Sequence, residues 1–143
     1  MAYNFFAPKP GRLGVHPVIV SNELLPTGGT LGVGTENHNV CASPAKAYVN
    51  RASICAAVFP TATSCTAQLF KMTGATAVAL TDTLIITGAA ANVPLQLVFL
   101  TTTTDANRTL NQGDSLRLAV VTGATVTIQP DDLAVYVELL VTE

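Results

Sequence analysis

The sequence predicts an all-β protein, an antiparallel β-sandwich or jelly roll of about eight strands with an extended N-terminal arm. Apolar residues alternate with polar or small residues through 115–120 and 133–142, which is the period of a half-buried strand. From residue 45 onward, turn-forming residues recur about every 8–12 positions, a spacing typical of sandwiches and barrels. No stretch has the apolar period of an amphipathic helix. These three observations together indicate the all-β class.

Residues 1–45 are predicted to form the arm, and residues 46–143 the sandwich domain. Five prolines and six glycines interrupt any long strand within the arm. The arm opens with aromatic and basic residues, in which a disordered tail would be poor. It either folds back on its own domain or reaches a neighbouring subunit, and both alternatives stay open. The candidate anchors for binding a partner are Tyr3, Phe5, Phe6, Lys9 and Arg12.

After the arm, strands dominate the pattern. Runs of β-branched, small and aromatic residues predict strands over 47–57, 64–72, 77–87 and 95–103. Three more strands are expected in close succession within 110–142. The turns between these strands are expected at residues 73–76, 105–107, 112–114, 122–123 and 129–132.

The composition is apolar and poor in charge. Hydrophobic residues make up 49% of the chain and charged residues 11%, compared with a usual charged share of about 25%. Such a surface is typical of a protein that meets other protein, so we expect obligate or near-obligate assembly. The net charge is −2 and the seven basic residues are scattered, so no nucleic-acid partner is expected. No apolar run reaches the roughly 18 residues of a membrane span, and the N-terminus has no signal-peptide pattern, so we expect no membrane partner and folding in a cytoplasm.

No motif for catalysis, metal binding or a cofactor stands out, so we expect neither an enzyme nor a small-molecule substrate. Cys41, Cys55 and Cys65 form an odd set without a CxxC pair, which predicts free thiols. His38 and Cys41 have ligand-like spacing, but a zinc site needs about four ligands. The glycine-rich residues 28–34 lack the Lys-Ser/Thr ending of a phosphate-binding loop.

A resemblance to a known family rests on residues 107–118 (NRTLNQGDSLRL) and 133–139 (LAVYVEL). In pattern and composition they are similar to the capsid decoration (cement) proteins of tailed bacteriophages, which have a jelly-roll or related β-fold. The resemblance implies a structural virion protein that binds across capsid-subunit joints and stabilises the capsid. It further implies a homotrimer on the capsid exterior, made in the host bacterial cytoplasm, with the major capsid protein as partner. No motif carries a functional residue over from the family.

Two alternative functions fit a β-rich chain of this kind. One is a structural component of a fibre, tail or neck. The other is a carbohydrate-binding β-sandwich module, which usually needs exposed aromatic side chains. Aromatic residues make up only 6% of the chain, tryptophan is absent, and three of the eight aromatics lie in the arm. The composition therefore favours the structural role over sugar binding.

Overall fold

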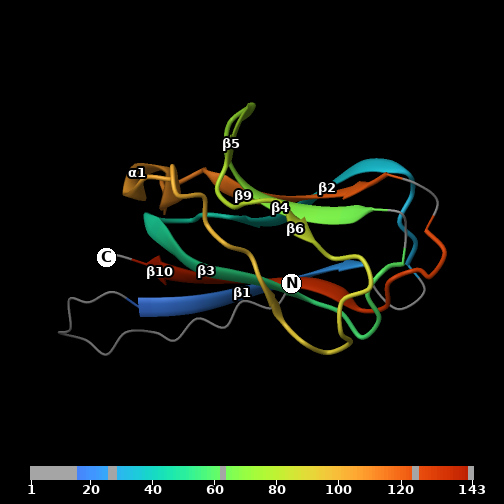
Figure 1. Ribbon diagram of the computed structural model, residues 1–143. Helices are drawn as coiled ribbons and strands as arrows, with labels where there is room; N and C mark the ends of the chain where they lie inside the picture. The colour runs from blue at the N-terminus through green and yellow to red at the C-terminus, as the bar shows by residue number, and fades with distance from the viewer. Residues whose placement is uncertain (1–15, 26–28, 62–63, 124–125, 142–143) are drawn as a thin grey trace.

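The computed structural model describes residues 16–25, 29–61, 64–123 and 126–141. Within these ranges the chain forms ten β-strands and one helix of four residues. The strands build two antiparallel sheets that lie face to face (Figure 1). The predicted all-β sandwich is therefore confirmed.

The first sheet, here called sheet A, contains both the first and the last strand of the described residues. Its order is β1 (His16–Leu25), β10 (Leu133–Val141), β3 (Ala47–Cys55) and β7 (Leu95–Gln96), and β8 (Thr109–Leu110) also pairs with β3. The short strands β7 and β8 pair with opposite ends of β3, so together they fill one edge position.

The second sheet, sheet B, repeats this plan. Its order is β2 (Gly34–Ala42), β9 (Ser115–Thr122), β4 (Cys65–Thr73) and β5 (Thr76–Ala79), and β6 (Leu84–Ile85) also pairs with β4. Gly74 turns the chain between β4 and β5 with a φ of 57°, a left-handed conformation that suits glycine. This hairpin rises from the outer side of sheet B (Figure 1).

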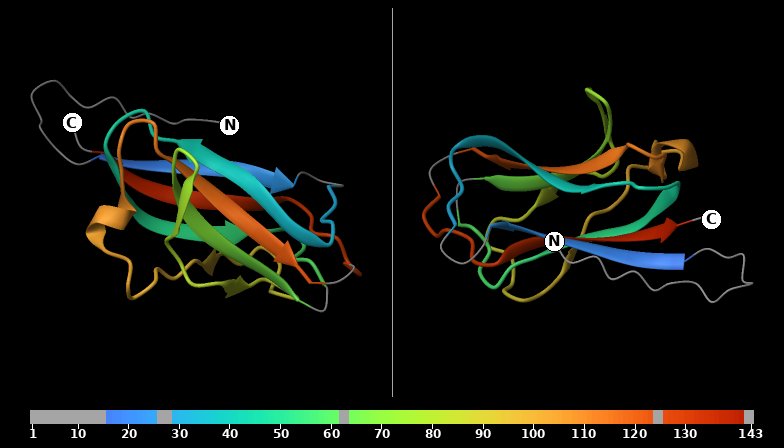
Figure 2. Two further views of the ribbon diagram at one scale, coloured as in Figure 1. Left: turned by 90° about the horizontal axis from the view of Figure 1, so that it is seen from above. Right: turned by 180° about the vertical axis from the view of Figure 1, so that it is seen from behind.

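The connections make the sandwich a jelly roll. The first four strands alternate between the sheets, with β1 and β3 in sheet A and β2 and β4 in sheet B. The chain then adds β5 and β6 to sheet B and β7 and β8 to sheet A. It finally crosses to sheet B for β9 and back to sheet A for β10. With each pair of short strands counted as one position, every sheet has four positions, which is the eight-strand jelly-roll plan. Figure 2 shows the two layers from above and from behind.

The core lies between the sheets and follows the period-two pattern of the sequence. From β10, Leu133, Val135 and Val137 are fully buried. From the facing sheet, Leu116 and Leu118 of β9 are fully buried as well. Each such side chain stabilises the fold by about 1.5–3 kcal/mol relative to exposure. Residues that alternate with these core positions lie on the two outer faces, where any recognition surface must form.

The structure differs from the predicted arm in residues 16–45, which contribute two full strands to the domain. Pro17 is tolerated because β1 is an edge strand, where a missing backbone donor breaks no ladder between two partners. Gly34, with a φ of 115°, begins β2 rather than interrupting it. The boundary expected at residue 45 is thus wrong for these residues, while residues 1–15 lie outside the described part of the chain.

Three further expectations are corrected. Residues 77–87 and 95–103 form only the short strands β5, β6 and β7, because these segments shift between edge positions instead of following one neighbour. Of the three strands expected within 110–142, the described residues form two long ones, β9 and β10, joined by a loop that makes isolated bridges. The turn expected at 105–107 is the helix α1 (Asp105–Arg108), which Thr104 caps by accepting a hydrogen bond from the Asn107 backbone N–H.

Candidate functional site

A hollow of about 410 Å³ lies on the outer face of sheet B. This volume falls within the roughly 300–1,000 Å³ of ligand pockets. Its side chains come from the three adjacent strands β2, β9 and β4, with one residue from the loop before β6. We call it the sheet B groove; its lining residues are Thr35, Asn37, Thr66, Gln68, Phe70, Thr83, Arg117, Ala119 and Val121.

The sheet B groove is hollow because its central residue is small. Ala119 pairs with Asn37 on one side and with Gln68 on the other. Its neighbours on the same face of β9 are Arg117 and Val121, since residues two apart share a face of a strand. A ring of longer side chains thus surrounds a methyl group that is only 7% exposed, and the methyl group forms the floor.

Arg117 is the one charged residue lining the groove. Its guanidinium carbon lies 5.6 Å from the ring centroid of Phe70, which is its cross-strand partner on β4. Its Nε atom is buried and has no hydrogen-bond acceptor. No ion pair joins this guanidinium to a carboxylate in the described part of the chain. A buried donor without an acceptor is costly. The charge of the guanidinium also has no carboxylate partner there, so it is available to an anion from outside the chain.

Arg108 provides a contrast within the same protein. It donates from Nε to the Val49 carbonyl and from Nη2 to the Asn50 carbonyl, both at 2.9 Å. Its guanidinium carbon also lies 3.9 Å from the ring centroid of Phe99 and 4.6 Å from that of Tyr48. These contacts fasten α1 to β3. The Arg108 guanidinium therefore donates hydrogen bonds within the fold, whereas Nε of Arg117 donates none.

The other polar groups of the groove are neutral. Gln68 is held in place by its Nε2 atom, which donates to the Thr81 carbonyl at 2.8 Å. This bond leaves the Oε1 atom of Gln68 as an acceptor. Thr35, Thr66 and Thr83 add hydroxyl groups, which both donate and accept. The groove thus combines one cation with several neutral hydrogen-bonding groups.

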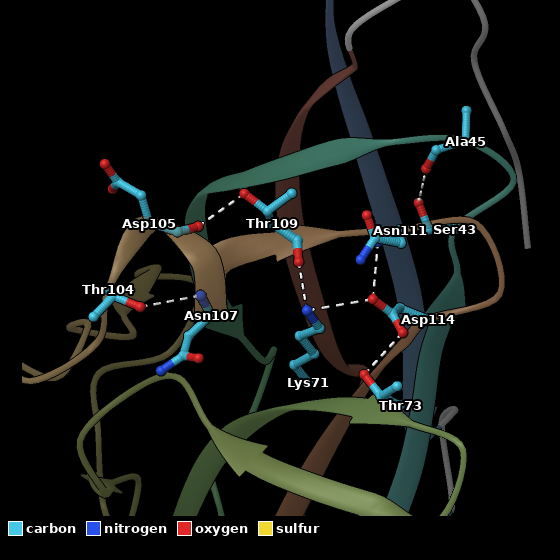
Figure 3. A network of polar contacts seen from close by, with 10 residues as sticks. All are labelled: Ser43, Ala45, Lys71, Thr73, Thr104, Asp105, Asn107, Thr109, Asn111 and Asp114. Atoms are coloured by element: carbon cyan, nitrogen blue, oxygen red, sulfur yellow. Dashed lines mark hydrogen bonds and ion pairs between the residues drawn. The ribbon is translucent and has the colours of Figure 1, made fainter.

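A second polar cluster lies at the end of the sandwich and is fully satisfied within the chain (Figure 3). Asp114 accepts from the Thr73 hydroxyl and the Asn111 backbone N–H, both at 2.8 Å, and lies 3.3 Å from Nζ of Lys71. Lys71 also donates to the Thr109 carbonyl at 2.6 Å. Burial alone would raise the pKa of Asp114, but these hydrogen bonds and the Lys71 charge together lower it. The cluster ties β4 to the turn before β9, and its two charges are paired with each other.

His38 and Glu36 lie side by side on β2. The Nε2 atom of His38 is buried without a hydrogen bond and lies 3.7 Å from Oε2 of Glu36. Burial lowers the pKa of His38 below its usual 6.5, and the opposing effect of the Glu36 charge is smaller. Burial thus favours the neutral imidazole, which does not form a salt bridge with Glu36. Glu36 instead accepts a hydrogen bond from the Gly32 backbone at 2.7 Å.

A small apolar cavity of about 100 Å³ lies near the start of β1, lined by Val18, Val20, Cys41 and Leu139 among others. It holds few polar groups and no unsatisfied one. Burial raises the pKa of the Cys41 thiol to about 11, which makes it a poor nucleophile. We interpret this cavity as a gap in the packing of the core and not as a ligand site.

The predicted site residues stand as follows. The five arm anchors Tyr3, Phe5, Phe6, Lys9 and Arg12 lie outside the described residues. All three cysteines are free thiols, as predicted, and two of them are buried. Within the described ranges, no group of three or more His, Cys, Asp or Glu side chains could hold a metal ion. No helix there is long and apolar enough to cross a membrane.

Sequence reasoning missed the sheet B groove, although part of its signal was present. Arg117 stands between Leu116 and Leu118, so the alternation already placed a cation on the outer face of a strand. The missing information was the register, which sets Phe70 and Gln68 of β4 beside β9.

In comparisons with known proteins, no family model, no curated protein and no solved structure matches this chain.

Proposed function

We propose that this chain is a structural virion protein that decorates and stabilises a phage capsid by binding across capsid-subunit joints. Its partners in this proposal are the major capsid protein and further copies of itself, on the capsid exterior. The resemblance of residues 107–118 and 133–139 to capsid decoration proteins supports it. The jelly-roll order of the strands also supports it, because this fold recurs in viral capsid proteins.

The apolar character of the exposed surface carries the proposal. Ile19 on sheet A is 60% exposed, and Ile85 on sheet B is 70% exposed. A charged share of 11% leaves few charged side chains around such positions. Surfaces of this kind are typical of protein interfaces. The exposed large hydrophobic residues are Ile19, Val33, Val58, Val78, Ile85, Val93, Val98, Val121, Ile128 and Tyr136.

Stabilisation in this proposal comes from area buried at the joints. Each square ångström of apolar surface removed from water contributes about 25 cal/mol before the costs of association. On a shell, many identical contacts act together, so a modest contact per copy raises the resistance of the whole particle. This role requires a rigid, stable domain and no reacting groups.

Quantitative mass spectrometry of purified virions, separated into heads and tails, tests the proposal. We expect the chain at high copy number in the head fraction. Recovery in the tail fraction alone would overturn the capsid role and favour a fibre, tail or neck component. Absence from purified virions would overturn the virion role altogether.

A second experiment tests the arm as the capsid-binding element. Capsids lacking the protein are mixed with the full chain or with a chain that lacks residues 1–12, and bound protein is measured after sedimentation. We expect the truncated chain to melt like the full chain but to bind more weakly. Phe5→Ala, Phe6→Ala and Arg12→Ala should each weaken binding by roughly 1–4 kcal/mol, as interface hot spots do. A truncated chain that melts early but binds normally would contradict this use of the arm.

A further inference from the structure

We propose that the sheet B groove binds a saccharide that carries a carboxylate group. This inference goes beyond the structural role proposed above and does not depend on it. It rests on the unpaired guanidinium of Arg117, the neutral polar lining around Ala119 and the shape of the groove.

The charge of the groove selects an anionic group. Arg117 is the only charged lining residue, its Nε atom is buried without an acceptor, and no carboxylate among the described residues pairs with its guanidinium. A guanidinium matches a carboxylate with two parallel hydrogen bonds. An arriving carboxylate would pair with the terminal Nη atoms of the guanidinium, which has no carboxylate partner among the described residues.

The remainder of the lining suits hydroxyl groups. Thr35, Thr66 and Thr83 present hydroxyls, and Asn37 and Gln68 present side-chain amides. The backbone groups beneath them are engaged in the ladders that join β2, β9 and β4. On the face of the sheet a ligand therefore meets side-chain hydrogen-bonding groups, which match sugar hydroxyls.

Size and shape agree with a short saccharide. The groove has a volume of about 410 Å³, which is enough for a few sugar rings and too small for a protein domain. The buried methyl group of Ala119 lies between the longer side chains of the lining, and the half-buried Phe70 adds an apolar wall beside Arg117. Sugar rings have apolar C–H faces that pack against such surfaces, while their hydroxyls reach the polar rim.

Two matched ligands test the role of charge. Trigalacturonate and its fully methyl-esterified form share one sugar backbone and differ in the carboxylate charge and in one methyl group on each carboxyl, and each is titrated into the ¹⁵N-labelled full chain. We expect trigalacturonate to shift the amide resonances of residues 117–121 and 66–70, and the ester to bind at least about tenfold more weakly, as the loss of a charge-assisted pair requires. Equal binding of the two ligands, or no shift at roughly 10 mM trigalacturonate, would overturn the proposal.

Three variants locate the site. Arg117→Gln should weaken trigalacturonate binding by about tenfold or more, and Ala119→Leu should abolish it by filling the floor. Arg51→Gln is the control, because Arg51 is an exposed arginine on the opposite sheet, and it should bind like the wild type. Preserved amide spectra of the free variants verify folding. Unchanged binding in both groove variants, or tighter binding of the acidic peptide acetyl-Ser-Glu-Ser-amide than of trigalacturonate, would overturn the assignment.

Discussion

The Nζ atom of Lys71 lies 3.3 Å from Oδ2 of Asp114, and the two side chains are only 12% and 6% exposed. This enclosed pair joins the last residues of β4 to the turn that precedes β9 (Figure 3). Gly113, with a φ of 89°, lets the turn close so that the Asp114 backbone N–H donates to the Asn111 carbonyl. The pair thus sets where β9 enters the sheet, and with it the position of the sheet B groove.

Replacing Lys71 by methionine should destabilise the protein by about 3 kcal/mol, because the enclosed Asp114 carboxylate loses its counter-charge. Urea unfolding at pH 7 measures the change. Thr73→Val is the matched comparison, since it removes one neutral hydrogen-bond donor to the same carboxylate and should cost about 1 kcal/mol. A loss for Lys71→Met no larger than that for Thr73→Val would show that the charge of Lys71 contributes nothing there.

His38 should make the fold less stable as the pH falls from about 7.5 to 5.5. Its pKa is lowered in the folded state by burial, so the unfolded chain takes up a proton near pH 6.5 while the folded chain resists it. Stability is therefore lost as the pH drops through 6.5 toward the folded-state pKa, and the loss levels off below that value. Chemical unfolding at a series of pH values measures this dependence.

The variant His38→Gln serves as the reference for that experiment. It keeps a polar side chain of similar size but does not titrate, so its stability should depend less on pH in this window. The other titrating groups remain in both proteins, and the difference between the two profiles isolates His38. Parallel profiles would contradict a lowered pKa for His38.

The three cysteines should differ sharply in reactivity toward a thiol reagent. Cys41 and Cys65 are buried, and burial raises the pKa of both thiols, that of Cys41 to about 11. At pH 8, only about one thousandth of Cys41 would be thiolate. Cys55 is half-buried on the outer face of sheet A, so we expect it to react first in the native protein.

Counting the modified thiols by mass spectrometry tests this order. The native wild type should gain one label at Cys55, and unfolding in urea should release the other two. The variant Cys55→Ser should remain unlabelled until it unfolds. Rapid native labelling of Cys41 would mean that the apolar cavity beside it opens easily.

The fold class was predictable from the sequence because the alternation of β9 and β10 is regular. Leu116, Leu118, Leu133 and Val135 repeat every two residues, and the structure buries all four. The strand β1 was not predictable, because proline at position 17 argues against a strand unless that strand is known to lie at an edge. Edge position is a property of the assembled sheet, and no local pattern records it.

The sheet B groove was beyond prediction for a related reason. Arg117, Ala119 and Gln68 look unremarkable in sequence, and they form a hollow only when the register sets Ala119 between Asn37 and Gln68. A shift of one residue would move every side chain of β9 to the other face. The small size of Ala119 therefore predicts a hollow only once the strands that pair with β9 are known.

The final prediction is that the isolated protein self-associates, with a trimer expected from the resemblance to decoration proteins. On the outer face of sheet A, Ile19 lies diagonally across from Tyr136 and Leu140, because its direct partner in the ladder is Glu138. Ile19 is 60% and Tyr136 is 42% exposed, so two large apolar side chains face solvent around Glu138 in the single chain. Replacing Ile19 by asparagine should weaken self-association without lowering the melting temperature, since the side chain contributes little to the core.

Analytical ultracentrifugation at micromolar concentration measures the assembly. The control is Val33→Asn, because Val33 is 65% exposed just before β2 on the other sheet and should not affect association through sheet A. We expect the wild type and Val33→Asn to sediment as the same oligomer, and Ile19→Asn to shift toward the monomer of 14.8 kDa. A wild type that sediments as a single 14.8 kDa species would refute self-association in solution. Copies would then meet only where a capsid lattice brings them together, and the exposed Ile19 and Tyr136 of sheet A would face another protein.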